Sequence, residues 1–323
     1  MIARIARVGS DRPHLRCFLG VFALMALLAT HQARADTLPL GAAASYGVLY
    51  EGTGGHNLSI SNVTINGNVG VGGTGVVQFS GPGTVNGKLD FSAASSGQYH
   101  NTNGGNVGPT SVNYNVSTVT SALSDPTTGI NDLSADVSGG TNVAFTNAGE
   151  TINESTGMLE TIDGAMLRVF NVTSYSATNS SVLTVNGDGS GDAVVFNFAV
   201  GAGNFGQHNA NLSGTVVFGG LGLTSPDQLL FNFQSSNQNI NLNNNGQVYQ
   251  GIILAPNDNM SIVHSTLDGR FFGGDSSDMQ IVSGDTLNAP AHATPEPSTP
   301  ALLLLVTGFI GVGKRFSARL FSE

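Results

Sequence analysis

Apolar residues alternate with serine, threonine and asparagine along most of the chain after Leu40. The segment 58–71 shows this period over its whole length. Such a period is typical of β-strands with one buried face. Further strands are predicted at 76–79, 85–91, 166–175, 182–185, 193–200, 212–218, 229–233, 248–254, 260–263, 267–272 and 279–282.

Residues 115–137 show a different period. Apolar positions recur there at helical spacing, and Pro126 interrupts the pattern in the middle. Because proline removes a backbone donor from a helix, we expect two short helices or one broken helix, lying on the side of the β-body. The apolar positions are Val116, Val119, Ala122, Leu123, Ile130, Leu133 and Val137.

Glycine and asparagine gather between the predicted strands, and the chain contains 44 glycines. Both residues tolerate the left-handed backbone that tight corners require. Short strands joined by such corners favour a mainly β fold, an irregular β-solenoid with a flanking α-helix. A β-sandwich explains the alternation almost as well. No linker-like composition appears before residue 289, so residues 36–288 are predicted to form one domain, followed by a spacer at 289–294.

The N-terminal 35 residues have the three parts of a secretory signal peptide. Four arginines precede an apolar stretch at 18–30, and Ala33 and Ala35 supply the small residues that signal peptidase requires. Cleavage is therefore predicted before Asp36. The single cysteine, Cys17, lies in the removed segment, so the mature chain is expected to contain no disulfide.

The C-terminal segment 295–323 also has three parts. Pro295, Glu296 and Pro297 form an extended motif, an uncharged apolar stretch covers 301–313, and the basic residues Lys314, Arg315 and Arg319 follow. The apolar stretch is shorter than the roughly 20 residues that comfortably cross a bilayer, and the basic residues are expected to stay on its cytoplasmic side. An ordinary C-terminal membrane anchor is the alternative interpretation.

This order of motif, apolar stretch and basic end resembles the PEP-CTERM sorting signal of Gram-negative bacteria. The resemblance implies recognition of Pro295-Glu296-Pro297 by an exosortase, a membrane-embedded protease. It also implies a precursor held transiently in the inner membrane and a product delivered to the cell surface or the exopolysaccharide matrix.

The formal charge of residues 36–294 limits the classes of ligand that this domain is expected to bind. Three basic and eighteen acidic residues lie within 36–294, which gives a formal charge of −15. Such a surface repels phosphate backbones and anionic lipid, so nucleic-acid binding is not expected. Divalent cations or neutral glycans remain compatible with it.

A second resemblance covers most of the mature chain. The segments 40–48 and 65–73 near its start, and 251–258 and 267–275 near its end, resemble the choice-of-anchor A domain of bacterial secreted proteins. That resemblance implies an adhesive module with an ice-binding-like β-solenoid architecture, and it supplies no catalytic residues.

Two glycine-rich segments, 70–75 and 201–206, match the dinucleotide-binding fingerprint literally. Strand-like sequence follows each of them, whereas the fingerprint needs a helix at that point. Both are therefore predicted to be turns.

Calcium is the only cofactor for which the sequence offers candidate ligands. Residues 186–192, with Asp188 and Asp192, imitate the first half of a calcium loop but lack the closing glutamate. A glycine-rich turn is the preferred interpretation. A second acidic group near the C-terminal end could hold calcium or form a solvated edge, and it consists of Asp268, Asp275, Asp278 and Asp285.

The sequence contains no serine-hydrolase elbow and no paired histidine motif for a metal. We therefore expect a non-enzymatic structural or adhesive protein whose asparagine, serine and threonine side chains contact exopolysaccharide. An enzyme acting on polysaccharide and an ice-binding module are the alternatives. Ice binding would favour a regular Thr-x-Thr array, and Thr118-Val-Thr120 has that form within the predicted helix.

Overall fold

A computed structural model describes residues 38–94, 96–102, 108–124, 133–134, 137, 139–145, 149–178, 180–198, 210–234, 239–243, 246–274 and 277–290. The strands in these ranges form sheets of thirteen, seven and three strands. Every neighbouring pair is parallel except one, in which β11 runs antiparallel to β12. Stacked parallel strands of this kind form a β-solenoid, as predicted, and the β-sandwich alternative is wrong.

The thirteen-stranded sheet contains β1 (Val48–Tyr50), β3 (Thr64–Asn66), β4 (Val69–Val71), β6 (Thr84–Phe91), β8 (Pro109–Asn113), β9 (Thr141–Phe145), β11 (Met158–Ile162), β12 (Ala165–Tyr175), β14 (Ala193–Phe198), β17 (Leu229–Phe233), β19 (Val248–Ala255), β21 (Thr266–Gly273) and β23 (Thr286–Asn288). The seven-stranded sheet contains β2 (Asn57–Ser61), β5 (Val76–Ser80), β7 (Tyr99–Asn101), β15 (Ala210–Leu212), β18 (Asn239–Asn243), β20 (Asn259–Val263) and β22 (Met279–Val282). The three-stranded sheet contains β10 (Glu150–Asn153), β13 (Val182–Asp188) and β16 (Thr215–Leu221).

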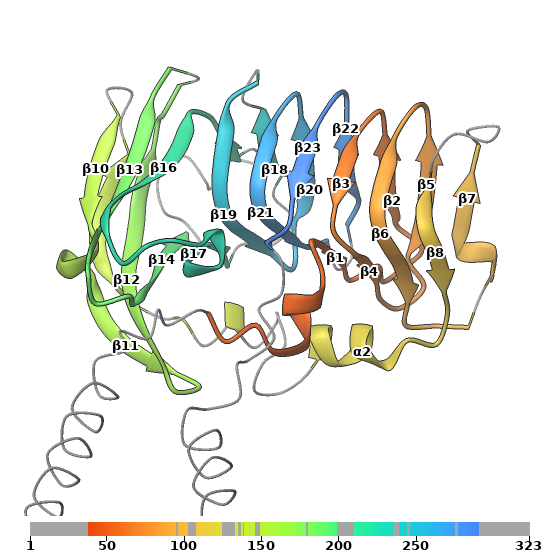
Figure 1. Ribbon diagram of the computed structural model, residues 1–323, viewed down its shortest axis with the longest axis horizontal. Helices are drawn as coiled ribbons and strands as arrows, with labels where there is room; N and C mark the ends of the chain where they lie inside the picture. The colour runs from red at the N-terminus through yellow and green to blue at the C-terminus, as the bar shows by residue number, and fades with distance from the viewer. Residues whose placement is uncertain are drawn as a thin grey trace, which may run out of the picture. The chain divides into compact units, whose positions relative to one another are not determined.

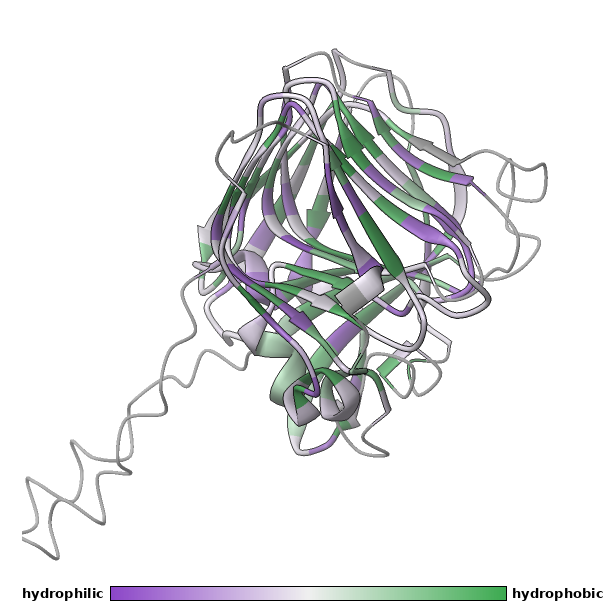
Figure 2. Ribbon diagram, turned by 90° about the vertical axis from the view of Figure 1, so that its right-hand side faces the viewer, coloured by the Kyte–Doolittle hydropathy of each residue, from purple (hydrophilic) through white to green (hydrophobic). Residues whose placement is uncertain are grey.

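The long strands bend and thereby take part in two sides of the solenoid. β21 pairs with β23 through Thr266–Asp268 and with β1 through Phe271–Gly273. Gly269 lies at the bend, where an added Cβ would stand 1.8 Å from the carbonyl oxygen of Gly251 in the next coil. Only glycine allows the coils to approach this closely. Viewed along the solenoid axis, the coils enclose a roughly triangular section (Figure 2).

The first and last strands of the described chain, β1 and β23, lie in the middle of the solenoid. From β1 it winds outward to β8, continues through α2 (Ser117–Ser124), and reaches the opposite end at β9. It then winds back until β21, β22 and β23 pair with β1, β2 and β3. We call this junction the seam; in Figure 1 it lies where the blue and orange strands meet.

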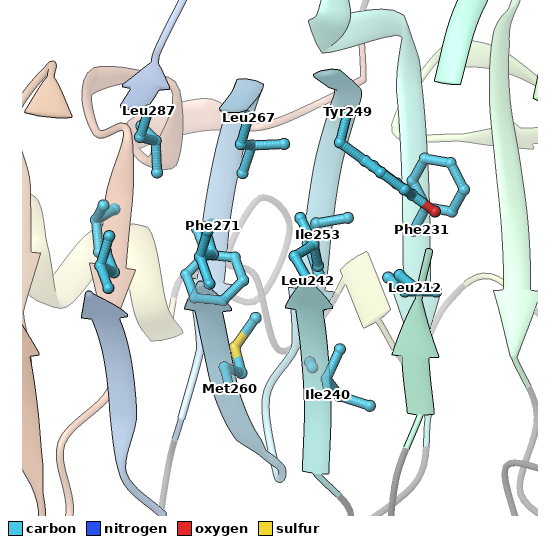
Figure 3. Close-up of a cluster of buried hydrophobic side chains, with 14 of the residues drawn as sticks. Leu212, Phe231, Ile240, Leu242, Tyr249, Ile253, Met260, Leu267, Phe271 and Leu287 are labelled. Atoms are coloured by element: carbon cyan, nitrogen blue, oxygen red, sulfur yellow. The ribbon is translucent and has the colours of Figure 1, made fainter. Parts of the chain in front are cut away.

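Two apolar layers stabilise the body. The first fills the inside of the coils, where residues such as Leu267, Phe271 and Leu287 stack from coil to coil (Figure 3). The second lies outside one side of the solenoid, where Leu230, Ile252 and Phe272 point outward and are fully buried. The helix α2 and the 3-10 helix η1 (Gly41–Ser45) cover this second layer through Val119, Ala122 and Ala43.

Most of the predicted elements are confirmed, and their limits differ by a few residues. The predicted flanking helix exists at Ser117–Ser124, and residues 133 and 134 are also helical. The predicted strand at 212–218 is divided between β15 and β16, because Gly214 adopts a φ of 96° and separates the two strands. Of the predicted turn at 70–75, residues 70 and 71 belong to β4 and residues 72–75 form the turn to β5. Residues 201–206 lie outside the described ranges. Within the described ranges, the other 3-10 helices are η2 (Ser96–Gln98), η3 (Glu154–Thr156) and η5 (Pro226–Gln228).

Candidate functional site: an open threonine–asparagine face

One side of the solenoid carries a regular array of polar side chains. Four coils place a threonine at one position and an asparagine or aspartate two residues later, with an inward apolar residue between them. Strand pairing aligns the four coils in the order β21, β23, β3, β6. We call this array the open face; its residues are Thr266 and Asp268, Thr286 and Asn288, Thr64 and Asn66, and Thr84 and Asn86.

The amide column of the open face is fixed by hydrogen bonds along the solenoid axis. The Nδ2 of Asn86 donates to Oδ1 of Asn66, Asn66 donates to Asn288, and Asn288 donates to Asp268, each at 2.7 Å. All donors point the same way and the series ends on a carboxylate, so the bonds polarise one another. The bond between Asn66 and Asn288 crosses the seam. The array is therefore complete only when both ends of the chain are in place.

The threonine column leaves its hydroxyl groups available. Within the described ranges, the hydroxyls of Thr64, Thr84, Thr266 and Thr286 make no hydrogen bond to protein. All four side chains are partly exposed. Each hydroxyl is both a donor and an acceptor, and each asparagine retains one N–H and one oxygen lone pair beyond its bonds in the column. The face therefore presents paired donors and acceptors to solvent.

The fold sets the spacing of these groups. Neighbouring strands lie about 4.8 Å apart, and residues two positions apart on a strand lie about 6.7 Å apart. Four coils thus give two straight columns, each roughly 14 Å long. Since the backbone fixes the columns, a ligand with a matching repeat meets groups that are already ordered.

A different asparagine ladder lies on the side that α2 covers. Asn171, Asn197 and Asn232 occupy aligned positions of β12, β14 and β17. Asn232 is fully buried; its Nδ2 donates to the backbone oxygen of Ser134 and to Oδ1 of Asn197, both at 3.1 Å. Asn197 donates to the backbone oxygen of Val137 at 3.3 Å. We call this side the covered face, because the amides of its ladder donate to backbone oxygens of the overlying residues.

The predicted calcium loop has a different set of partners. Asp188 accepts the backbone N–H of Ser190 at 2.8 Å, and this bond lowers the pKa of Asp188. Asp192 is buried and pairs with Arg168 at 2.8 Å. Glu154, which the sequence analysis missed, is fully buried and accepts from Ser190 Oγ and from the backbone of Asp188. Burial raises the pKa of Glu154.

The second acidic group is dispersed over three locations. Asp268 ends the amide column, and Asp278 accepts the backbone N–H of Asn57 at 2.8 Å across the seam. Asp285 is buried at a corner, where burial raises its pKa to about 6 although backbone N–H groups of Ser265 and Val282 donate to it. Asp275 lies outside the described residues. Across the ranges that the structure describes, no three acidic, histidine or cysteine side chains gather as metal ligands, and calcium binding stays a prediction.

The predicted processing sites all lie outside the described residues. These are Ala33, Ala35 and Asp36 at the signal cleavage site, Pro295, Glu296 and Pro297 in the sorting motif, and Lys314, Arg315 and Arg319 after the apolar stretch. Among the residues that are described, no helix is both long and apolar enough to span a membrane.

Comparison with protein families gives one match that covers most of the body. Residues 37–281 match the family described as "Putative Ice-binding-like adhesive domain". The chain belongs to this family. The description is that of a binding module and names no enzymatic activity. A search of curated proteins gave no match.

Solved structures of ice-binding proteins resemble this ice-binding-like adhesive domain. The ice-binding protein of the Antarctic ascomycete Antarctomyces psychrotrophicus is 18% identical, with a TM-score of 0.50 over 79% of this chain and 99% of that one. A glycosylated ice-binding protein from an Arctic yeast is 15% identical (82% and 98% covered, TM-score 0.48). The DUF3494 domain of a Shewanella frigidimarina ice-binding protein is 13% identical (78% and 97% covered, TM-score 0.46). The first of these likenesses shows that the domain has the ice-binding-protein fold.

The open face could not be recognised from a Thr-x-Thr pattern within one strand, because its threonines line up across four coils. The sequence does contain a Thr-x-Asn/Asp unit that recurs after 20 residues, once near the start and once near the end of the described chain. The join between the two pairs spans 222 residues and depends on the seam.

Proposed function

We propose that this domain is an exported adhesive module that binds neutral polysaccharide of the cell surface or extracellular matrix through the open face. The observation that supports this most directly is the pair of aligned columns. The amide column is held by 2.7 Å hydrogen bonds, and the threonine hydroxyls beside it make no hydrogen bond to described protein groups. An extended β-linked polysaccharide presents hydroxyl groups at a repeat close to that of the coils.

The distribution of charge supports a neutral ligand. The body contains three basic side chains, of which Arg270 is buried against Asp227 and Arg168 pairs with Asp192. Lys88 is the remaining one, and the domain carries a formal charge of −15 over residues 36–294. Anionic polysaccharide would therefore be repelled, whereas neutral hydroxyl groups can bind the amides directly.

The last described residue, Pro290, is held beside the covered face. Arg270 donates from Nη2 to the backbone oxygen of Pro290 and from Nη1 to that of Tyr46, next to the apolar layer of the covered face. Pro290 therefore lies on the covered side, and the predicted sorting segment 295–323 follows it in the sequence. We propose that exosortase processing of this segment, after removal of the signal peptide, delivers the domain to the surface or matrix of a Gram-negative bacterium.

Binding can be tested with two polymers that share a backbone and differ in charge. Affinity electrophoresis of the purified protein in hydroxyethyl cellulose should retard the wild type, and carboxymethyl cellulose should retard it much less. The variant Thr64→Lys/Thr286→Lys, which places two long hydrated side chains over the columns, should be retarded clearly less than the wild type. Thr151→Lys/Thr161→Lys, at exposed threonines of β10 and β11, is the control of equal charge. Equal retardation of both variants, or no retardation of the wild type, would contradict the proposal. Depolymerisation of the polymer by the wild type would instead indicate an enzyme.

Ice binding is the second candidate, and the aligned column of four threonines favours it. Hydroxyls spaced by the strand repeat can order water on a flat face. The adjacent column consists of amides and one carboxylate, so a Thr-x-Thr array is absent from the open face. Thermal hysteresis of the wild type, lost in Thr64→Lys/Thr286→Lys and retained in the control, would establish ice as the ligand. Absence of hysteresis together with polymer retardation would establish the polysaccharide.

A further inference from the structure

A second polar surface lies on the neighbouring side of the solenoid. It is the outward side of β18, β20 and β22, and we call it the amide face. A hollow of about 200 Å3 opens there to solvent. Asparagine, serine, glutamine and aspartate provide the polar lining, which consists of Asn239, Asn241, Asn259, Ser261, Asp278 and Gln280.

Several of these side chains retain hydrogen-bonding capacity. Ser261 and Gln280 make no hydrogen bond to protein within the described part of the chain. Asn259 uses its Oδ1 to accept the backbone N–H of Asp278 at 3.1 Å, which leaves its amino group to donate. Asp278 accepts from the backbone of Asn57, and its carboxylate has further lone pairs for a hydroxyl donor. The hollow thus combines donors and acceptors around one carboxylate and contains no lysine or arginine.

The amide face and the open face point in different directions. β20 is joined to β21 by a corner at His264 and Ser265, and β22 is joined to β23 by a corner at Ser283–Asp285. At the first corner His264 has a φ of 51°, and at the second Ser283 has a φ of 74°. The chain therefore turns sharply between the two surfaces. Figure 2 shows α2 beneath one side of the triangular body.

We infer that the amide face is a second binding surface for neutral polysaccharide, so that one domain holds two polysaccharide chains and cross-links them. This inference rests on the proposed function of the open face. The ligand class follows from the same chemistry, because amides and hydroxyls bind sugar hydroxyls and Asp278 repels anionic sugars. One rod-like chain lying on either face cannot bend around the corner, so the two faces take separate chains.

Cross-linking can be measured by the viscosity and light scattering of hydroxyethyl cellulose mixed with the purified protein. The wild type should raise both at intermediate protein-to-polymer ratios, and excess protein should reverse the rise by occupying every site singly. The variants are Ser261→Lys/Gln280→Lys on the amide face and Thr64→Lys/Thr286→Lys on the open face. Each variant should still bind polymer through its intact face. The increase in viscosity that it causes should be at least tenfold smaller than that of the wild type. The control Thr151→Lys/Thr161→Lys should behave as the wild type, and circular dichroism melting should show that all four proteins fold.

The outcomes separate the inference from the proposed function. If the amide-face variant raises viscosity as the wild type does, the second surface is wrong. If the wild type binds polymer without raising viscosity at any ratio, the inference fails while the proposed function stands. If the wild type does not bind polymer at all, the proposed function itself fails. Self-association of the protein without polymer, seen by light scattering, would attribute cross-linking to oligomers and would also overturn the inference.

Discussion

The two asparagine ladders of this solenoid have the same residue type in the same kind of strand register, and they do different work. On the covered face, Asn232 and Asn197 are buried and donate to backbone oxygens of the segment at 133–137. On the open face, Asn66 and Asn288 are partly exposed and bond to one another along the axis. What differs is the cover. An amide column is part of the core when a segment lies over it, and it is a candidate binding surface when no described segment does.

The largest loss of stability should follow when a buried charge on the covered side is removed. Arg270 is 1% exposed and holds Asp227 through two hydrogen bonds of 2.7 and 2.8 Å. Arg270→Leu leaves the Asp227 carboxylate without its partner, so the free energy of unfolding should fall by about 4 kcal/mol. Urea denaturation measures this, and Arg270→Leu/Asp227→Leu should regain part of the loss. A loss below about 1 kcal/mol in the single variant would show that the charge is not buried.

The comparison of the two ladders is tested directly by the same substitution on each. In Asn232→Ala, the hydroxyl and the backbone oxygen of Ser134 and the Oδ1 of Asn197 each lose a buried hydrogen bond. The free energy of unfolding should therefore fall by about 3 kcal/mol. Asn66→Ala interrupts the exposed column, where water replaces the lost partners, and should cost less than about 1 kcal/mol. Chemical denaturation of both variants checks the pair. Equal losses would mean that cover does not distinguish the ladders.

The smallest effect concerns the buried carboxylate of Asp285, at the corner between β22 and β23. The pKa of Asp285 is raised to about 6 from its ordinary value of 3.8 because burial disfavours its charged form. Between these values the native protein binds a proton that the unfolded chain does not, so stability from this group rises as pH falls from 7 toward 4. The gain from pH 7 to pH 5 should be about 1 kcal/mol. In Asp285→Asn this gain should disappear from the pH dependence of the denaturation midpoint; an unchanged pH dependence would contradict the assignment.

The local parts of this fold could be predicted from the sequence. Alternation gave strands such as β17 and β22 with their observed limits, and helical spacing at Val119 and Ala122 indicated the flanking helix. The covered ladder also leaves a trace in the sequence, because an asparagine lies between two phenylalanines in the otherwise apolar strands β14 and β17. An amide in so apolar a strand must find a partner when it is buried.

The order of the coils could not be predicted, because pairing between the first and last coils leaves no local signal. Asn66 and Asn288 are 222 residues apart, and only the seam makes them neighbours. The same limitation explains why the partners of the predicted calcium loop could not be predicted. The spacing of Asp188 and Asp192 is visible in the sequence, whereas Arg168 and Glu154 come to the loop from other coils.

The most direct test of the account is to observe the side-chain amides of both ladders while a neutral oligosaccharide is added. In two-dimensional NMR spectra of the purified protein titrated with cellohexaose, the NH2 signals of Asn66, Asn86 and Asn288 should shift in a saturable manner. Those of Asn171, Asn197 and Asn232 should stay in place. If the three signals of the open face do not move, or if only the covered ladder responds, the open face is not the binding surface.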